Sequence, residues 1–166
     1  MTSEVPPASL ELRSLVTEQG ALELSLTDVQ VPVPRPGQVL IRVEAAPINP
    51  SDLGLLFAGA DMITATVDGT PERPVVTAPL SEGARRALAA RAGRSLPVGN
   101  EGAGTVVAAG ESPEAQGLMG RTVSVAGGGM YTQYRVTEAS SCLVLPEGTP
   151  PGRGRHPSST RSPPSA

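Results

Sequence analysis

Apolar and polar residues alternate most regularly over Gln38–Ala45 (QVLIRVEA). A period of two residues is the mark of a half-buried β-strand, so this stretch predicts a strand. Two more alternating stretches, Leu10–Thr17 and Ala21–Leu26, are separated by the short polar turn Glu18-Gln19-Gly20. Two strands joined by such a turn predict a β-hairpin.

A glycine-rich stretch, Val98–Glu111 (VGNEGAGTVVAAGE), leads into the β-branched and small apolar run Thr105–Ala109. Glycine lets one backbone approach another closely and permits positive φ, whereas the run after it is typical of a buried strand. We therefore predict a glycine turn that opens into a core strand. Glu101 is the single acid inside that turn.

Three shorter apolar runs follow, at Arg121–Ala126, Met130–Val136 and Cys142–Pro146, and Gly127-Gly128-Gly129 separates the first two. Short strands joined by glycine turns are typical of small barrels and sandwiches. The pattern predicts a mainly β fold with minor α, built as a partly open β-barrel.

Helical signals are few. Ser81–Arg94 (SEGARRALAARAGR) combines a capping serine with a glutamate in the first turn, and it predicts one inserted helix at about residues 81–93. A short helical turn is expected over Ser51–Ala58, with Ser51 as its cap. Ala60–Pro79 has no clear period and several prolines, so we expect a long loop with at most short extended pieces.

Composition narrows the class of protein. The 166 residues carry a net charge of −3, which gives no basic footprint for nucleic acid, and one cysteine excludes an internal disulfide framework. No apolar run approaches membrane length, and the N-terminus lacks the pattern of a leader. We expect a cytoplasmic protein with no membrane contact.

Three segments differ in composition. Residues 1–9 read as a flexible N-terminus and residues 10–145 as one folded domain. From Pro146 to Ala166 there are six prolines and no Val, Ile, Leu, Met, Phe or Tyr. Such a segment cannot bury enough apolar surface to offset its ordering entropy, so a disordered tail is expected over residues 146–166.

The order and spacing of two stretches, Val98–Glu111 and Gly37–Leu53, resemble the medium-chain dehydrogenase/reductase superfamily in its N-terminal GroES-like catalytic domain. The resemblance covers most of Leu10–Gly148. Tyr131 and Tyr134 fit the Gly-x-Tyr-x-x-Tyr-type strand of that family. It implies a GroES-like barrel that shapes the substrate side of an oxidoreductase cleft.

The resemblance also bears on metal binding. Zinc-dependent relatives carry a cysteine where this chain has Asn49-Pro50-Ser51-Asp52 and a histidine where it has Asn100. An amide is a poor zinc ligand beside thiolate and imidazole. We therefore expect no zinc, and the chain is similar to the zinc-independent quinone oxidoreductases and enoyl reductases.

Asn49 and Ser51 are the candidate catalytic residues, because the resemblance places polar side chains there beside the nicotinamide and the substrate. As positioning groups they would orient or hydrogen-bond a carbonyl, with Asn49 on the nicotinamide side. The alternative is structural: Asn49 caps its own turn and Ser51 caps the next helix.

Glu101 is expected to accept hydrogen bonds from backbone amides of the glycine turn. Tyr131 reads as a core or rim aromatic in preference to a general acid.

No Gly-x-Gly-x-x-Gly occurs in the sequence, and GNEGAG has its glycines at the wrong offsets. NADPH or NADH would serve the full-length family enzyme, but none is expected to bind this fragment.

The C-terminal segment allows a second reading. When the codons possible for His156–Ala166 are read one base out of frame, their permitted translations include Ser-Phe-Val-Asn-Pro-Leu-Thr-Ala-Leu-Gly. That string resembles the start of the family's inter-domain helix. We hypothesise a frameshift that replaces the Rossmann domain, against a natural Pro/Ser-rich tail.

The sequence thus predicts a truncated NAD(P)H-dependent oxidoreductase whose complete form reduces a conjugated carbonyl substrate, quinone or enoyl, by hydride transfer. A non-catalytic GroES-like interaction module is the alternative, with Ala60–Pro79 as its only candidate partner loop. The predicted partner is the small-molecule substrate. Self-association is expected through an exposed apolar face at Ile48–Phe57 and Cys142–Leu145.

Overall fold

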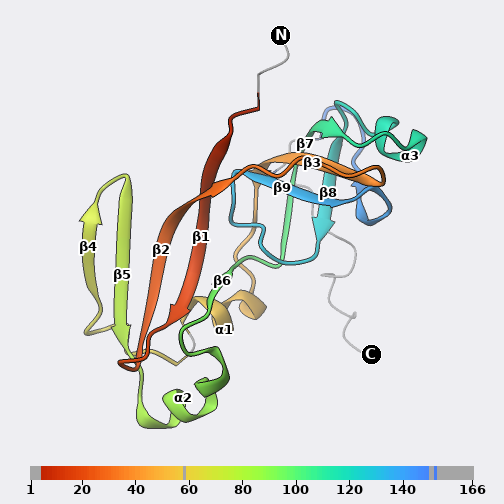
Figure 1. Ribbon diagram of the computed structural model, residues 1–166. Coiled ribbons are helices and arrows are strands. Elements are labelled where there is room, and N and C mark those ends of the chain that lie inside the picture. Colours follow the sequence, from red (N-terminus) through yellow and green to blue (C-terminus); the bar gives the residue numbers. More distant parts are fainter. Residues whose placement is uncertain (1–4, 58, 150–151, 153–166) are drawn as a thin grey trace, which may run out of the picture.

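The computed structural model describes residues 5–57, 59–149 and 152. Its strands form two five-stranded antiparallel sheets, in the orders β4-β5-β2-β1-β6 and β10-β8-β7-β3-β9 (Figure 1). The strands are β1 (Ala8–Val16), β2 (Ala21–Gln30), β3 (Gln38–Ala45), β4 (Thr66–Thr70), β5 (Arg73–Pro79), β6 (Ser95–Pro97), β7 (Glu101–Ala109), β8 (Thr122–Ala126), β9 (Tyr134–Glu138) and β10 (Leu143–Val144). The helical elements are η1 (Pro50–Asp52), α1 (Leu53–Leu56), α2 (Glu82–Ala87), η2 (Ala89–Arg91), α3 (Pro113–Gln116) and η3 (Ala139–Ser141).

The first sheet is built on the predicted hairpin. β1 pairs with β2 over the full length of β1, from Ala8 opposite Gln30 to Val16 opposite Leu22. Gly20 adopts φ 81° in the turn between them, a conformation that glycine reaches at little cost. A small core at the turn end of this sheet is made by Val16, Leu22 and Leu80.

The second sheet carries the larger core. β3 has the bounds that its alternation predicts, and Val39 and Ile41 are fully buried. They pack with buried apolar side chains from the neighbouring strands and loops, namely Val106, Ala115, Val123, Val125, Met130 and Ala139. Burying a side chain of this kind contributes about 1.5–3 kcal/mol, so this cluster is the main source of stability in the domain.

The segment 130–133 joins the two sheets. The backbone N–H of Leu12 donates to Tyr131 O at 2.9 Å, and that of Gln133 donates to Leu10 O at 3.0 Å. On its other side, the N–H of Val43 donates to Gln133 O at 2.9 Å. The sheets therefore share a bridge without closing completely, and the predicted mainly β, partly open architecture is confirmed. The returning strand was predicted from Met130, but β9 begins at Tyr134 because this bridge uses the preceding residues.

Most of the glycine-rich stretch Val98–Glu111 is a strand, whereas a glycine turn was predicted for its first part. β7 begins at Glu101, and only Gly99 before it has positive φ, 92°. A Cβ built on Gly104 would lie 2.0 Å from the carbonyl oxygen of Arg42 in β3. Close approach of two strands, which the sequence also indicated, is therefore the main reason for glycine here.

The region Ala60–Pro79 was predicted as a long loop, and this was wrong in its main part. It holds the hairpin β4–β5, and β5 pairs with β2 as an added part of the first sheet. Pro71 lies in the hairpin turn, and Pro74 and Pro79 lie near the two ends of β5. Proline is tolerated at such positions. The alternative function, an interaction module, relied on this region as a loop that binds a partner. Most of the region is a hairpin instead.

The inserted helix is present but shorter than predicted. Ser81 caps α2, accepting from the N–H of Ala84 at 3.2 Å, and the helix ends at Ala87 before η2. No helix among the described residues is long and apolar enough to span a membrane. The predicted disorder and the frameshift hypothesis fall almost wholly on residues 150–151 and 153–166, which lie outside the described part.

Candidate functional site

The loop that leaves β3 begins with Asn49 in an extended conformation, followed by Pro50 at the first position of η1. Asn49 is the cap of this turn and forms a capping box with Asp52; its backbone N–H donates to Asp52 Oδ2 at 2.7 Å. Asn49 therefore caps its own turn, as the structural alternative to a catalytic role predicted. The prediction that Ser51 is the cap was wrong, because Pro50 takes the first position of the turn and its cap is Asn49, two residues upstream.

Asp52 joins this loop to the segment before β7. Its side chain is 1% exposed, and while Oδ2 binds Asn49, Oδ1 accepts the backbone N–H of Asn100 at 2.9 Å. A buried carboxylate is stable only when hydrogen-bond donors compensate its lost hydration. The two backbone amides provide that compensation, and they fix the distance between the two loops.

Glu101 makes the second link. It is 5% exposed, and its Oε1 accepts a hydrogen bond from Asn49 Nδ2 at 2.8 Å. Backbone amides of the glycine turn were predicted as its partners, and this was wrong: Asp52 takes the amide of Asn100 instead. Glu101 is the first residue of β7, where it lies opposite Ala126 of β8.

Ser51 makes the third link. Its hydroxyl accepts a hydrogen bond from Asn100 Nδ2 at 2.9 Å, and its side chain is exposed. The structure thus brings both predicted site residues, Asn49 and Ser51, against the GNEG stretch. Asp52 was not predicted as part of the site. The spacing Asn49-x-x-Asp52 is a capping-box pattern and is the signal that would have found it.

Tyr131 closes one side of this cluster. Its hydroxyl donates to the carbonyl oxygen of Pro47 at 3.0 Å, and its ring lies against Gly99, where a Cβ would come within 2.6 Å of it. Burial, together with the nearby Asp52 carboxylate, raises the pKa of Tyr131 to about 12. These contacts are those of a packed rim aromatic that holds the loop.

The donor set does not fit a catalytic zinc. No group of three or more His, Cys, Asp or Glu side chains that could hold a metal occurs within residues 5–57, 59–149 and 152. The amide nitrogens of Asn49 and Asn100 both donate hydrogen bonds to oxygen, at 2.8 and 2.9 Å. A nitrogen that carries hydrogens has no lone pair to offer a metal.

The glycine stretch likewise does not fit a pyrophosphate. Gly102 and Gly104 lie inside an antiparallel strand, and the space beside them is taken by backbone of β3, Ala45 O at 3.0 Å and Arg42 O at 2.0 Å from a built Cβ. A dinucleotide needs glycines that open a helix and leave backbone N–H groups free. These described residues offer no such cradle.

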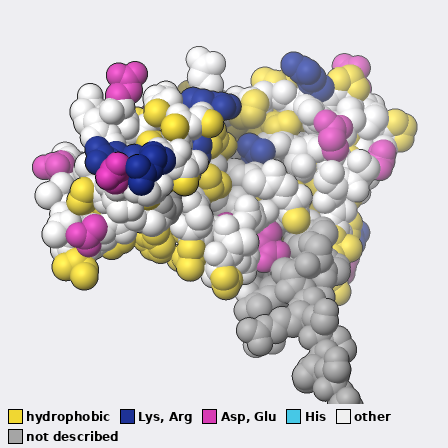
Figure 2. All heavy atoms as spheres, turned by 90° about the horizontal axis from the view of Figure 1, so that it is seen from below, with side chains coloured by type: hydrophobic (Ala, Val, Ile, Leu, Met, Phe, Trp, Pro, Cys, Tyr) yellow, Lys and Arg dark blue, Asp and Glu magenta, His cyan; other side chains and the backbone are white. Residues whose placement is uncertain are grey.

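Large apolar side chains of the loop after β3 and of β10 are exposed to solvent. Ile48 is 73% exposed, and Leu53 and Phe57 are about two-fifths exposed. Leu143 and Val144 of β10 are exposed to a similar degree. Figure 2, seen from below, shows hydrophobic side chains at the surface among polar ones. The predicted exposure is present at the five side chains named above, whereas Leu56 and Leu145 are buried.

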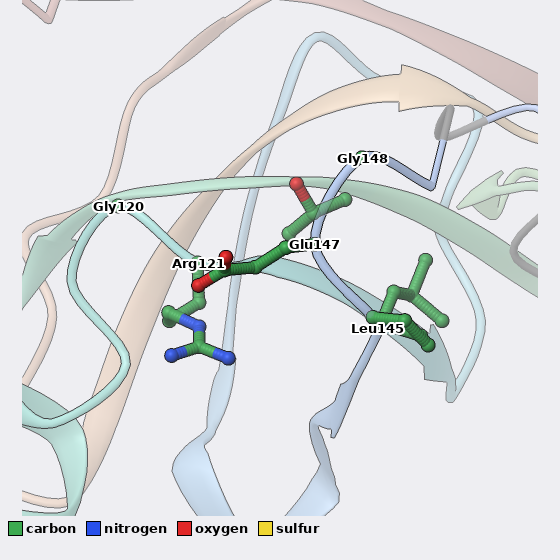
Figure 3. Close-up of a pocket in the computed structure, with 7 residues that line it drawn as sticks. Gly120, Arg121, Leu145, Glu147 and Gly148 are labelled. Carbon is green, nitrogen blue, oxygen red and sulfur yellow. The ribbon is translucent and has the colours of Figure 1, made fainter.

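A separate hollow lies at the opposite end of β8. It is lined by Gly120, Arg121, Thr122, Leu145, Pro146, Glu147 and Gly148. Figure 3 shows the Glu147 side chain extending toward Arg121 across it. None of its lining residues belongs to the cluster around Asp52, so it is not part of the candidate site.

Two antiparallel sheets bridged into an open barrel, with a capped loop pinned to a glycine-rich strand, define a domain of the GroES type. Residues 35–147 match the family model of the alcohol dehydrogenase GroES-like domain, and the chain belongs to that family. A search of curated protein sequences gives no match.

Solved structures of similar fold are quinone oxidoreductase-like members of the medium-chain dehydrogenase/reductase superfamily. A Mesorhizobium loti protein that carries the name NADPH:quinone reductase is 26% identical, with a TM-score of 0.56, over 90% of this chain and 40% of its own. A Pseudomonas syringae quinone oxidoreductase is 18% identical, with a TM-score of 0.53, over 86% of this chain and 35% of its own. A mycobacterial protein complexed with NADPH is 20% identical, with a TM-score of 0.53, over the same shares. The chain therefore spans well under half the length of these relatives.

Proposed function

We propose that residues 10–145 form the substrate-side domain of a zinc-independent oxidoreductase that reduces a conjugated carbonyl compound, a quinone or an enoyl substrate. The hydride donor, NADPH or NADH, would be bound by a second domain outside residues 10–145. The relatives support this division, since the chain corresponds to 40% or less of their length.

One observation carries the proposal. By the family resemblance, zinc-dependent relatives place metal ligands within Asn49-Pro50-Ser51-Asp52 and at Asn100, and here the amides of Asn49 and Asn100 are both engaged in a hydrogen-bond network. That network leaves a hydroxyl, Ser51, at the exposed side of the site. A hydroxyl and an amide can orient a carbonyl by hydrogen bonding without a Lewis acid.

The proposed roles differ between the two residues. Ser51 would contact the carbonyl oxygen of the substrate. Asn49, whose Nδ2 gives one hydrogen to Glu101 Oε1 at 2.8 Å, keeps a second amide hydrogen for the nicotinamide side. Asp52 and Glu101 would hold both side chains in place without contacting the ligand.

The test starts from the gene. The nucleotide sequence downstream of the codon for Gly148 is read in all three frames, and a glycine-rich βαβ unit is expected in another frame. The complete protein expressed from that frame is expected to oxidise NADPH or NADH with a quinone or an enone and to contain no stoichiometric zinc. Ser51→Ala should lower its kcat/KM by about tenfold, the loss expected from one hydrogen bond to a developing charge. A true stop with no such unit downstream would favour the interaction module.

The chain itself offers a second test. Calorimetry with NADPH and with NADH should show no saturable binding at micromolar cofactor, because the pyrophosphate cradle is absent from the described residues. Saturable binding would contradict the division into two domains. Elemental analysis that finds one tightly held zinc per chain would contradict the zinc-independent assignment.

A further inference from the structure

Among the described residues, the hydroxyl of Ser51 has one hydrogen-bond partner, and the direction of that bond is defined. Asn100 Nδ2 donates and Ser51 Oγ accepts, at 2.9 Å. A serine hydroxyl has one proton to give and two lone pairs to receive with. Because Asn100 occupies a lone pair, the proton of Ser51 is left for another acceptor.

Asn100 is held in place by a buried group. Its backbone N–H donates to Asp52 Oδ1 at 2.9 Å, and Asp52 is 1% exposed. The loop that carries Ser51 is bound to the same carboxylate, through Asn49 N to Oδ2 at 2.7 Å. Asp52 therefore fixes both partners of the Asn100–Ser51 bond relative to each other.

The Ser51 side chain is exposed, so its proton can reach an acceptor that comes from solvent. An amide hydrogen that enters the oxygen also polarises the hydroxyl and makes it a better donor.

We propose that Asn100 is a positioning residue that makes Ser51 an outward hydrogen-bond donor, so that this site selects ligands with an acceptor oxygen. The group that fits this donor best is a carbonyl oxygen, which can only accept. This inference rests on the proposed function for the identity of the ligand. The orientation of the hydroxyl itself does not depend on it.

The orientation is tested by NMR on the full chain labelled with ¹⁵N and ¹³C. One side-chain amide proton of Asn100 should exchange with water about fivefold more slowly than the other, the factor that one net hydrogen bond contributes. Ser51→Ala should make the two rates equal, and Ser51→Thr, which keeps the hydroxyl, should preserve the difference. Ser51 is exposed, so both variants should fold. An Asn100 exchange pattern that Ser51→Ala leaves unchanged would overturn the proposal.

The selectivity is tested with cyclohexanone, which offers only an acceptor oxygen and has no conjugated double bond for a thiol to attack. Chemical-shift titration should show binding at Ser51, and Ser51→Ala should raise the Kd about fivefold. Asn100→Asp should raise it as much, because a carboxylate only accepts and therefore takes the Ser51 proton. Gln19→Glu makes the same change of charge in an exposed turn and should leave the Kd unchanged.

The outcomes separate the two ideas. Asn100→Asp binding cyclohexanone as tightly as the unmodified chain would overturn the positioning role of Asn100. The expected amide exchange combined with no cyclohexanone shift at Ser51 would support the orientation of the hydroxyl and overturn the carbonyl site of the proposed function.

Discussion

Among single residues, Asp52 is expected to contribute most to holding the site together. It is 1% exposed and accepts hydrogen bonds from the backbone N–H groups of Asn49 and Asn100. Asp52→Ala leaves both amides without a partner in a buried place, so the free energy of unfolding should fall by about 3 kcal/mol. Urea denaturation with linear extrapolation measures it.

Glu82→Ala is the matched control for the loss of a carboxylate. Glu82 pairs with Arg86 on the exposed face of α2, and such surface pairs contribute about 0–1 kcal/mol. If Asp52→Ala destabilised the chain no more than Glu82→Ala does, the two hydrogen bonds that Asp52 accepts would contribute nothing to stability.

Tyr131 predicts a dependence of stability on alkaline pH. Its pKa in the folded chain is raised to about 12 from the usual 10.0 of a tyrosine. Between these values the unfolded chain has lost the phenolic proton and the folded chain keeps it, so its contribution is complete below about pH 10 and falls as the pH rises toward about 12. The difference in Tm between the unmodified chain and Tyr131→Phe should therefore shrink from pH 9 to pH 12. A constant difference would show that the phenol titrates alike in both states.

At the residue scale, the sequence predicted which residues belong to the site better than it predicted their hydrogen-bond partners. Asn49, Ser51 and Glu101 were singled out, and all three lie in one hydrogen-bonded cluster. Asp52 was read only as a helix residue, because a buried acid cannot be told from an exposed one without knowing which loops meet. The donor to Glu101 was assigned wrongly for the same reason.

At the scale of elements, the close contact between β3 and β7 depends on a missing side chain. Gly104→Ala would place a Cβ 2.0 Å from Arg42 O, a backbone atom that can move only with its strand. We expect a loss of about 3 kcal/mol or more, at or above the upper end for overpacked cores. Thermal denaturation followed by circular dichroism measures the change.

Gly127→Ala provides the control, since a Cβ there meets nothing within 4 Å and Gly127 does not have positive φ. It should change the free energy of unfolding by about 0.5 kcal/mol or less. Equal effects of the two substitutions would contradict the steric argument for Gly104.

Elements with strong local signals were predicted well. β3 has the predicted bounds because period-two alternation and a following proline turn agree there. β4 and β5 were missed because their sequence, Thr66–Pro79, is rich in proline and glycine and its stability as a hairpin comes from pairing with β2. Non-local pairing of this kind leaves no local pattern.

At the scale of the whole molecule, the exposed apolar side chains predict self-association. Ile48, Leu53 and Phe57 line one loop, and Leu143 and Val144 are exposed on β10. Soluble monomers seldom leave a large contiguous apolar patch open to water. Sedimentation should show association at high concentration, and a dye for apolar surfaces should bind.

Two variants sharpen that experiment. Ile48→Ser should reduce both the association and the dye signal. Val33→Ser serves as the control, because Val33 is 86% exposed but lies in the segment between β2 and β3. A strictly monomeric chain with no dye signal would contradict this prediction and favour a self-sufficient module.

The family was predictable from the sequence because the order and spacing of several weak signals agree. No single motif would have been enough, because GNEGAG alone matches no motif with a defined function. The path of residues 130–133 between the sheets could not be foreseen, because it depends on backbone partners in β1 and β3.

The clamp at Asp52 also has a consequence for the order of folding. It joins residues 48 apart in sequence, and the Asn49–Glu101 bond spans 52. Contacts between distant residues form slowly, since the loop entropy is lost before the contact is gained. During synthesis, the loop after β3 therefore leaves the ribosome well before its partner strand exists. The N-terminal hairpin can form at once, whereas the site takes shape only after β7 has emerged.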